Sequence, residues 1–409
     1  MSLPTTVASP LHVPPPGAVA VLLDPKAMLQ PLATLWTALT ERLCADGIAL
    51  ARSSCSVPML HPEQRSTQLI WTPETGTKSI PRGWSTAGSA MFAKSPMRPL
   101  VDGEAKVIRH RIRPDDDVRP YDILDELAAD GFTDYLATIT EGTTPWERAP
   151  VTWATKHPGG FTDAQVDQLL GTTALLSLLL SIHAHRASSR SLLTTYLGAD
   201  AASRVLDGHV RRGDVFDIEA AVCFCDLRNF TTLSQQLSQA DLLDLLDDAF
   251  DAVVGAVEAE RGDVLKFIGD AVLAVFRVEG GEDARREAVA RAFRAGRASI
   301  RATQERDAER RAAGKAPLTV GLSLHLGNVA YGNIGGPSRL DFTVIGAAVN
   351  LASRLEGMCR TLEAPMVVSD EVARRLDADV LAACRLEDAG AHVLKGIPEP
   401  VRVWALRHG

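Results

Sequence analysis

The pattern of apolar and polar positions becomes regular after about residue 216, where strand-like and helix-like stretches alternate. The elements expected there are a strand at 218–225, a helix at 240–258, strands at 264–268 and 272–276, a helix at 283–311 and a strand at 318–324. This β-α-β-β-α-β order predicts a ferredoxin-like unit, an antiparallel sheet with both helices on one face. A helix at 349–358 and short strands near 366, 385, 393 and 403 are expected to complete an α+β domain.

The first half of the chain shows a less regular α+β pattern. Residues 1–20 are rich in Pro, Ser and Thr, and we expect a disordered lead-in. A helix is expected at 29–43 and strands at 68–72 and 107–112, and the segment 151–161 is expected to be a strand that ends in a turn. A Pro-Gly-Gly turn then leads to Thr162, which is placed to cap a long helix ending near residue 186. Such an ending resembles that of a GAF-type sensory domain, here spanning 21–189, and 190–215 is expected to be a helical connector.

Composition and charge argue against a nucleic-acid-binding, disulfide-rich, membrane or secreted protein. The 409 residues are 46% hydrophobic and carry a net charge of −8, so we expect folded domains and no nucleic-acid partner. The six cysteines have no metal-ligand or disulfide-framework spacing. The most apolar run, 169–182, is too short for a membrane span, and no secretion signal is recognisable. We therefore expect a cytoplasmic protein without a membrane partner.

Two aspartates are the strongest candidates for chemistry. Asp226 follows an apolar strand, and Asp270 lies between two strands in a Gly269-Asp270 turn. Each has a structural alternative: the role of Asp226 could be limited to an Asx-turn or a cap of the next helix, and that of Asp270 to the hairpin turn. A ferredoxin-like sheet would bring them together, and paired carboxylates without His or Cys suit Mg²⁺ or Mn²⁺ with a nucleoside triphosphate. The chain has no GxxxxGK[ST] phosphate loop.

Three further polar residues stand in apolar surroundings. Lys266 interrupts an apolar strand, where its ammonium must either reach water or meet an acceptor. Asn350 and Arg354 are four residues apart on an expected helix, so an amide and a guanidinium share one face. That pair could hold a phosphate or could form an ordinary polar stripe, and the residues alone leave both possibilities open.

Together, three segments resemble the class III nucleotidyl cyclases. They are Phe224-Cys-Asp-Leu-Arg-Asn-Phe-Thr231, Val264-Leu-Lys-Phe-Ile-Gly-Asp270 and Phe342-Thr-Val-Ile-Gly-Ala-Ala-Val-Asn-Leu-Ala-Ser-Arg354. The resemblance covers 216–409 and implies a palm-like cyclase domain. It also implies that Asp226, Asp270 and the Leu227 carbonyl bind two ions of Mg²⁺ or Mn²⁺.

The resemblance also implies roles in binding the substrate. Arg354 matches the arginine that neutralises charge on the α-phosphate, and Asn350 matches the amide that positions the ribose. Lys266 and Thr343 match a pair that reads adenine, which favours ATP. Thr343 stands where many members carry Asp, as in a subgroup with bicarbonate-responsive bacterial cyclases. The remaining substrate-binding candidates implied in this way are Lys395, Phe230 and Thr231.

Family members build their sites across a head-to-tail dimer, so the resemblance implies a homodimeric adenylyl cyclase regulated by its N-terminal module. The regulator, a small molecule or a protein, is not readable from the residues. A guanylyl cyclase and a nucleotide-binding sensor without activity are the alternatives. A diguanylate cyclase is not expected, because the GG[DE]EF signature is absent.

Overall fold

The computed structural model describes residues 12–85, 90–113, 119–142 and 144–407, and the chain divides into two compact units, 1–192 and 193–409. The N-terminal unit contains a six-stranded sheet in the order β3-β2-β1-β6-β5-β4, and every neighbouring pair is antiparallel. Its strands are β1 (Arg52–Pro58), β2 (Gln64–Thr72), β3 (Gly76–Gly83), β4 (Val107–Arg111), β5 (Asp134–Ile139) and β6 (Pro150–Thr155).

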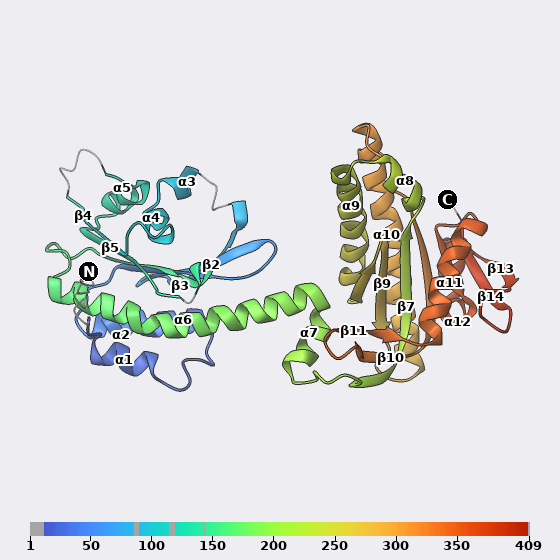
Figure 1. Cartoon of the computed structure of the whole chain (residues 1–409), viewed down its shortest axis with the longest axis horizontal. Helices are drawn as coiled ribbons and strands as arrows, with labels where there is room; N and C mark the ends of the chain where they lie inside the picture. Colours follow the sequence, from blue (N-terminus) through green and yellow to red (C-terminus); the bar gives the residue numbers. More distant parts are fainter. Residues whose placement is uncertain (1–11, 86–89, 114–118, 143, 408–409) are drawn as a thin grey trace, which may run out of the picture. The chain divides into compact units, whose positions relative to one another are not determined.

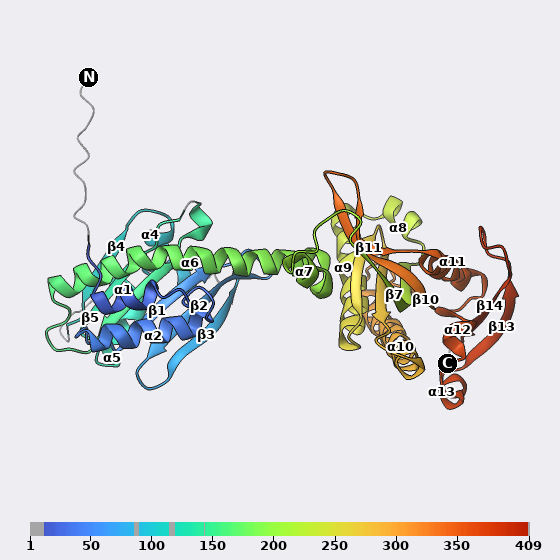
Figure 2. The ribbon, with the colours of Figure 1, turned by 90° about the horizontal axis from the view of Figure 1, so that it is seen from below.

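Helices cover both faces of this sheet (Figure 1). On one face lie α1 (Pro16–Leu22), α2 (Leu32–Ala45) and α6 (Asp163–Leu197), packed against alternate strand residues such as Cys55, Leu69 and Trp153. Figure 2 shows α1 alongside α2. The other face meets α4 (Met97–Val101) and α5 (Asp122–Ala129) near the β4–β5 edge; α3 (Ala90–Ala93) and the 3-10 turn η2 (Pro145–Glu147) are short.

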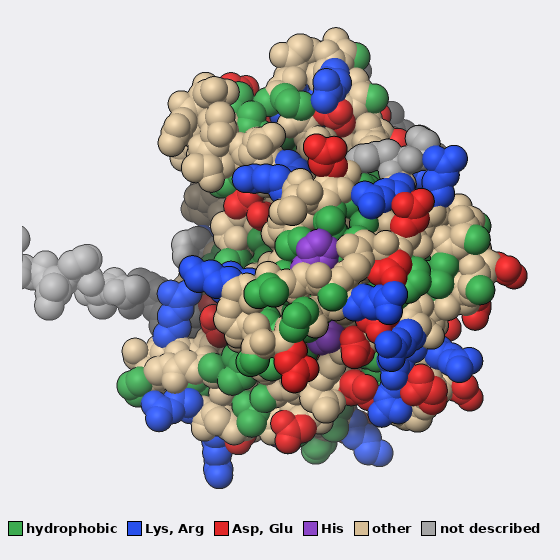
Figure 3. Space-filling model, turned by 90° about the vertical axis from the view of Figure 1, so that its right-hand side faces the viewer, with side chains coloured by type: hydrophobic (Ala, Val, Ile, Leu, Met, Phe, Trp, Pro, Cys, Tyr) green, Lys and Arg blue, Asp and Glu red, His purple; other side chains and the backbone are tan. Residues whose placement is uncertain are grey.

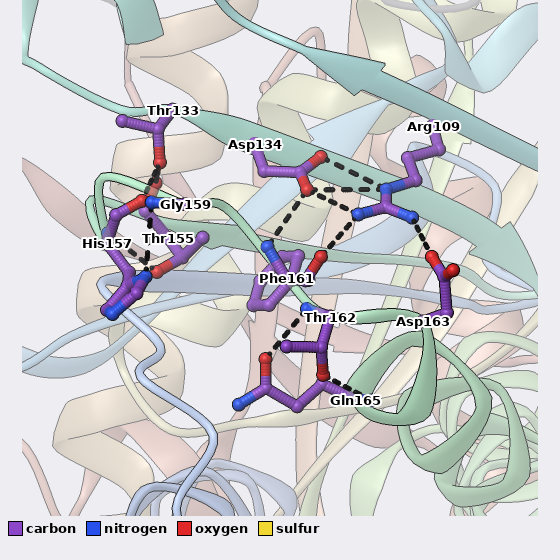
Figure 4. Close-up of polar contacts among 10 residues, drawn as sticks. All are labelled: Arg109, Thr133, Asp134, Thr155, His157, Gly159, Phe161, Thr162, Asp163 and Gln165. Atoms are coloured by element: carbon purple, nitrogen blue, oxygen red, sulfur yellow. Dashed lines mark hydrogen bonds and ion pairs between the residues drawn. The ribbon is translucent and has the colours of Figure 1, made fainter.

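The start of α6 is held by a polar network that includes the buried Asp134 (Figure 4). Thr162 and Gln165 form the expected cap, each side chain accepting from the other's backbone N–H, at 3.2 and 3.0 Å. The fully buried Asp134 pairs with Arg109 at 2.8 Å and accepts from the Phe161 N–H at 3.0 Å. Gly160, at φ +66°, leaves no room for a Cβ beside the Asp134 carboxylate. The turn from β6 into α6 is thus tightly specified.

Three expectations for the N-terminal unit need correction. Residues 12–20 are ordered, because α1 buries Ala18 and Leu22 in the core; residues 1–11 lie outside the described part. Leu29 is exposed and precedes α2, because Pro31 starts that helix. The helix expected to end near 186 continues to Leu197. By length and composition alone, α6 is long and apolar enough to cross a membrane. One side of it is buried against the sheet, as in the core helices of soluble proteins.

The C-terminal unit has the predicted ferredoxin-like core inside a larger mixed sheet. Its strand order is β13-β14-β12-β10-β7-β9-β8, with β11 paired to β10, and the β10–β12 pair is parallel. The strands are β7 (Val215–Leu227), β8 (Asp263–Ile268), β9 (Ala271–Arg277), β10 (Val320–Gly335), β11 (Leu340–Ile345), β12 (Met366–Ser369), β13 (Leu386–His392) and β14 (Val401–Leu406).

The two faces of this sheet carry different helices. α9 (Gln239–Ala259) and α10 (Glu282–Ala312) pack on one face, against Ala221, Cys223 and Cys225 of β7. α11 (Ala347–Thr361) and α7 (Ala199–Leu206) pack on the other, against Ala220 and Val222. Figure 2 shows β7 and β10 between α9 and α11. The short helices are α8 (Phe230–Gln236), α12 (Asp370–Ala373) and α13 (Ala378–Ala383). The prediction of two helices on one face is confirmed.

The expected connector is mostly helical and is bonded to the cyclase-like core. Asp200 of α7 accepts from the Tyr331 hydroxyl and pairs with Arg204 and Arg277, each contact at 2.8 Å. These bonds lower the pKa of Asp200 although burial acts to raise it. α7 is therefore part of the C-terminal unit.

On the face drawn in Figure 3, Lys and Arg side chains are interspersed with Asp and Glu. In the C-terminal unit, Arg402 of β14 pairs with Asp388 of β13, and Arg407, just after β14, pairs with Glu387 of β13. A mixed surface of this kind produces no extended field of one sign on the face shown.

Candidate active site

The structure brings Asp226 and Asp270 together. Asp226 is the penultimate residue of β7 and lies opposite Ala271 of β9. Ala271 is the residue that follows Asp270 in sequence. Gly269, at φ +66°, forms the tight turn that places Asp270 beside the end of β7. The two carboxyl groups are within hydrogen-bonding distance of each other. The predicted meeting of these acids is confirmed as geometry.

The electrostatics of the pair oppose two full negative charges. Burial, a hydrogen bond with Asp270 and the charge of Asp270 raise the pKa of Asp226 to about 7. Glu356 raises it further, while Arg228 acts in the opposite direction. An acid with such a pKa keeps its proton in about half of the molecules at neutral pH unless a cation replaces that proton.

Sequence reasoning missed Glu356 and Arg228. Glu356 projects from α11 toward the pair, and burial together with the Asp270 charge raises its pKa. Both side chains approach Gly321, which lies opposite Asp226 on β10, so closely that a Cβ there would collide with them. The available signal was Gly321 itself, because a glycine inside an apolar strand marks a close approach.

Lys266 lies on β8 just after a bulge. The register shifts between Val264 and Lys266, which turns Leu265 into the core. The Lys266 ammonium is 3.1 Å from the carboxylate of Asp341 on β11, so it meets an acceptor. Thr343, two residues along β11, is buried, and its hydroxyl has no hydrogen-bond partner among the described residues. Lys266 on β8 and Thr343 on β11 therefore lie on strands that are not paired in the sheet but meet through the Lys266–Asp341 ion pair. Asp341 is a further polar group that was not predicted.

Asn350 and Arg354 lie on the outward face of α11, as the spacing predicted. The inward face is formed by Ala348, Ala352 and Leu355, and both polar side chains are exposed. Among the described residues, neither side chain forms a hydrogen bond or an ion pair with Asp226 or Asp270. An exposed amide and guanidinium are available to a group that is not part of this chain's own fold.

The other candidates lie at the ends of elements around this region. Leu227 ends β7 with its side chain buried, and Phe230 and Thr231 begin α8. Phe230 packs against the core while Thr231 is exposed. Lys395 is exposed in the loop between β13 and β14, which packs on α11 through Leu394.

The residues present fit a divalent cation by their chemistry. A pair of acids that repel each other and keep a proton gain stability when a hard cation neutralises them, and backbone carbonyls complete such sites. Among the described residues, no group of three or more His, Cys, Asp or Glu side chains is arranged to hold a metal alone. Any ion here would take further ligands from water or substrate phosphates.

Residues 217–408 match the family model of the adenylate and guanylate cyclase catalytic domain. The C-terminal unit is a class III nucleotidyl cyclase catalytic domain. The match begins two residues after the start of β7 and ends beyond β14. Asp226, Asp270, Asn350 and Arg354 all lie inside it, whereas the N-terminal unit lies outside. The GAF-like assignment of residues 21–189 therefore stays a prediction.

Individual proteins are similar to the same region. An adenylate cyclase from Anabaena cylindrica is 31% identical over 46% of this chain, and adenylate cyclase 1 from Rhizobium meliloti is 28% identical over 40%. The matches span 36% and 24% of those proteins. The crystal structure of the adenylyl cyclase CyaB from P. aeruginosa is 28% identical with a TM-score of 0.42, covering 48% of this chain and 97% of that one.

Proposed function

We propose that this protein is an adenylyl cyclase that converts ATP to 3′,5′-cyclic AMP and pyrophosphate. The observation that carries the proposal is the half-buried Asp226–Asp270 pair at the junction of β7 and β9 in a cyclase catalytic domain. In the reaction, the ribose 3′-oxygen bonds to the α-phosphorus as the bond to the oxygen bridging the β-phosphorus breaks. The hydroxyl proton passes to solvent.

Asp226, Asp270 and the Leu227 carbonyl are proposed to hold two ions of Mg²⁺ or Mn²⁺. Such ions, when bound, lower the pKa of the 3′-hydroxyl and neutralise the triphosphate. The guanidinium of Arg354 neutralises charge that grows on the α-phosphate, and the amide of Asn350 orients the ribose. Lys395, Phe230 and Thr231 are proposed to contact the substrate. The exposed, unengaged side chains on α11 support this assignment.

Lys266 and Thr343 are proposed to read the base, with ATP as the preferred substrate. The ion pair between Lys266 and Asp341, which is two residues from Thr343 on β11, supports a shared role. The unpartnered hydroxyl of Thr343 can donate or accept, so it does not reject guanine as a mismatched charge would. A guanylyl cyclase is therefore the second candidate. Parallel assays with ATP and GTP distinguish the two, and equal rates would contradict the proposed base-reading pair.

We further propose that the active form is a homodimer with both sites at the interface. Strand β8 is a sheet edge and ends in Phe267 and Ile268, which are 51% and 47% exposed; Ile345, the last residue of β11, is 50% exposed. A free edge that carries apolar side chains favours pairing with a second copy. The N-terminal unit is proposed to regulate the homodimer through helix α6, which is continuous from Asp163 to Leu197. The protein is proposed to act in the cytoplasm.

The central experiment is a cyclase assay on the purified chain with ATP and Mg²⁺ or Mn²⁺, measuring cyclic AMP and pyrophosphate. We expect turnover that falls by about 10²-fold or more in Asp270→Ala and in Arg354→Ala. Asp247→Ala, which removes an exposed carboxylate on α9, is the matched control and should keep full activity. ATP binding without turnover in the wild type would favour the inactive sensor instead.

A mixing experiment tests the shared sites. Asp270→Ala and Arg354→Ala are each expected to be inactive, yet a heterodimer of the two would hold one site with all its groups intact. An equal mixture should recover about a quarter of the wild-type activity, because half of the dimers are mixed and each has one intact site of two. Absence of any recovery after subunit exchange would contradict sites built from two chains.

A further inference from the structure

The N-terminal unit contains a cavity of about 500 Å³ on the sheet face opposite α2. Along β1, Cys55 and Val57 point into the core beneath α2, while Ser54 and Ser56 point into the cavity. The same alternation on β2 places Gln68 there. Segments around α4 and α5 form the opposite wall, with apolar groups such as Met97. The cavity thus has a polar floor and a partly apolar roof.

Four arginines line this cavity: Arg52, Arg65, Arg82 and Arg148. Among the described residues, none of them forms an ion pair. Arg82 donates to the amide oxygen of Gln68 at 3.0 and 2.6 Å, and Arg65 lies 5.6 Å from the centre of the Phe92 ring. The buried Nε–H of Arg148 has no acceptor within the part of the chain that the structure describes.

The acidic groups at the cavity do not balance these charges. Asp122 and Glu126 both line it and both are exposed. Asp122 is 3.9 Å from Lys94, a fifth cation of the lining, and Glu126 has no ion pair among the described residues. Four guanidiniums around one cavity repel one another unless an anion lies among them. This arrangement is costly for an empty cavity and favourable for a charged ligand.

We propose that this cavity binds a small organic anion that carries a carboxylate or phosphate group. Guanidinium groups match both anions through paired N–H donors, and Arg148 has a buried donor to offer. Aromatic side chains of Trp84 and Trp146 also line the cavity, so the rest of the ligand is apolar or aromatic. The volume suits a compact metabolite. Binding is independent of the proposed cyclase activity; its regulatory consequence rests on that proposed function.

Binding is tested on the full chain with three ring-matched probes: phenyl phosphate, phenylacetate and the uncharged phenylacetamide. A chelator keeps divalent ions away from the cyclase domain. Five of the six tryptophans lie in the N-terminal unit, and Trp84 and Trp146 line the cavity, so quenching of tryptophan fluorescence reports binding. We expect at least one anion to bind about ten-fold or more tightly than the amide. The stronger of the two anions identifies the ligand class.

Three variants assign the binding to the cavity. Arg52→Gln and Arg148→Gln should each weaken anion binding about ten-fold or more, while Arg98→Gln should not. Arg98 pairs with Asp102 on α4 outside the lining, which makes it the matched control. Without ligand, Arg148→Gln should melt no lower than the wild type, because an unneutralised charge has been removed. Equal affinity for the amide, equal affinity in the variants or no binding of any probe would each overturn the proposal.

A cyclase assay with the tighter anion then separates the two proposals. A change in cyclic AMP formation in the wild type that is absent in Arg148→Gln would link the cavity to regulation. Saturable binding without a change in activity would leave the binding site standing and refute its regulatory role. An inactive protein that still binds the anion would refute only the cyclase proposal.

Discussion

Replacing Asp226 by Asn should stabilise the metal-free protein at alkaline pH while abolishing activity. The reason is the raised pKa of Asp226, about 7, which results first from burial and then from Asp270. In the unfolded chain this carboxyl loses its proton near pH 3.8. Between these two values the native state holds a proton that the unfolded state has lost. The free energy of unfolding therefore falls as pH rises from about 4 to about 7 and stays low above that.

The size of the effect follows from the displacement of the pKa. Each pH unit corresponds to about 1.4 kcal/mol, so Asp226 can destabilise the metal-free fold by at most about 4 kcal/mol at pH 8. The side chain is only half-buried, and solvent screens part of the repulsion, so we expect about 2 kcal/mol. For a unit of this size that corresponds to a melting temperature about 6 °C higher in Asp226→Asn. Near pH 4 the variant gains nothing from this source.

Thermal unfolding from pH 4 to 8 in the presence of a chelator measures this difference. Asp247→Asn, an exposed carboxylate on α9, is the control and should follow the wild-type profile. Adding Mg²⁺ at pH 8 should stabilise the wild type and not Asp226→Asn, because bound metal replaces the proton. Parallel pH profiles for the wild type and Asp226→Asn would refute the reasoning, since the two carboxyl groups would then not destabilise the metal-free fold.

Four other substitutions have defined outcomes. Asp134→Ala should cost about 3 kcal/mol or more in urea unfolding of the N-terminal unit, because Arg109 and the Phe161 N–H lose their buried partner. Gly321→Ala should destabilise the cyclase domain by at least about 1 kcal/mol in thermal unfolding, whereas Gly255→Ala, in open space on α9, should stabilise it by about 0.5 kcal/mol. Asp341→Asn should raise the KM for ATP more than it lowers kcat, because only the orientation of Lys266 changes.

The core of the cyclase domain was predictable because its patterns are local. Residues 242–257 show one apolar stripe, and α9 buries it. The second half of β10 was missed, since Gly327, Asn328 and Gly332 interrupt the strand pattern. Gly327 is required there because a Cβ would press on Ala348 of α11, a contact that depends on tertiary packing. The strand expected near 393 is wrong: Val393 is 82% exposed, and only the adjacent Leu394 anchors that loop.

The candidate site was predictable for residues that lie at the ends of strands. It was not predictable for residues that come together from elements far apart in sequence. Asp226 and Asp270 are each marked by an apolar strand next to them, and topology alone brings them together. Arg228 and Glu356 meet over Gly321 from two elements that lie far apart in sequence. Their approach follows from the packing of α11 on β10, which no local periodicity encodes.

The ion pair between Lys266 and Asp341 affects how Lys266 could contact the base of a bound nucleotide. Thr343 has a hydroxyl where many cyclases place a carboxylate, so it cannot neutralise the ammonium of Lys266. Asp341, on the same strand two residues earlier, supplies that charge instead, at 3.1 Å. Its side chain is 57% exposed, and an ion pair so open to water is worth at most about 1 kcal/mol. Lys266 is therefore held in position by a bond weak enough for a nucleotide to displace, which leaves the proposed base-reading lysine oriented and available.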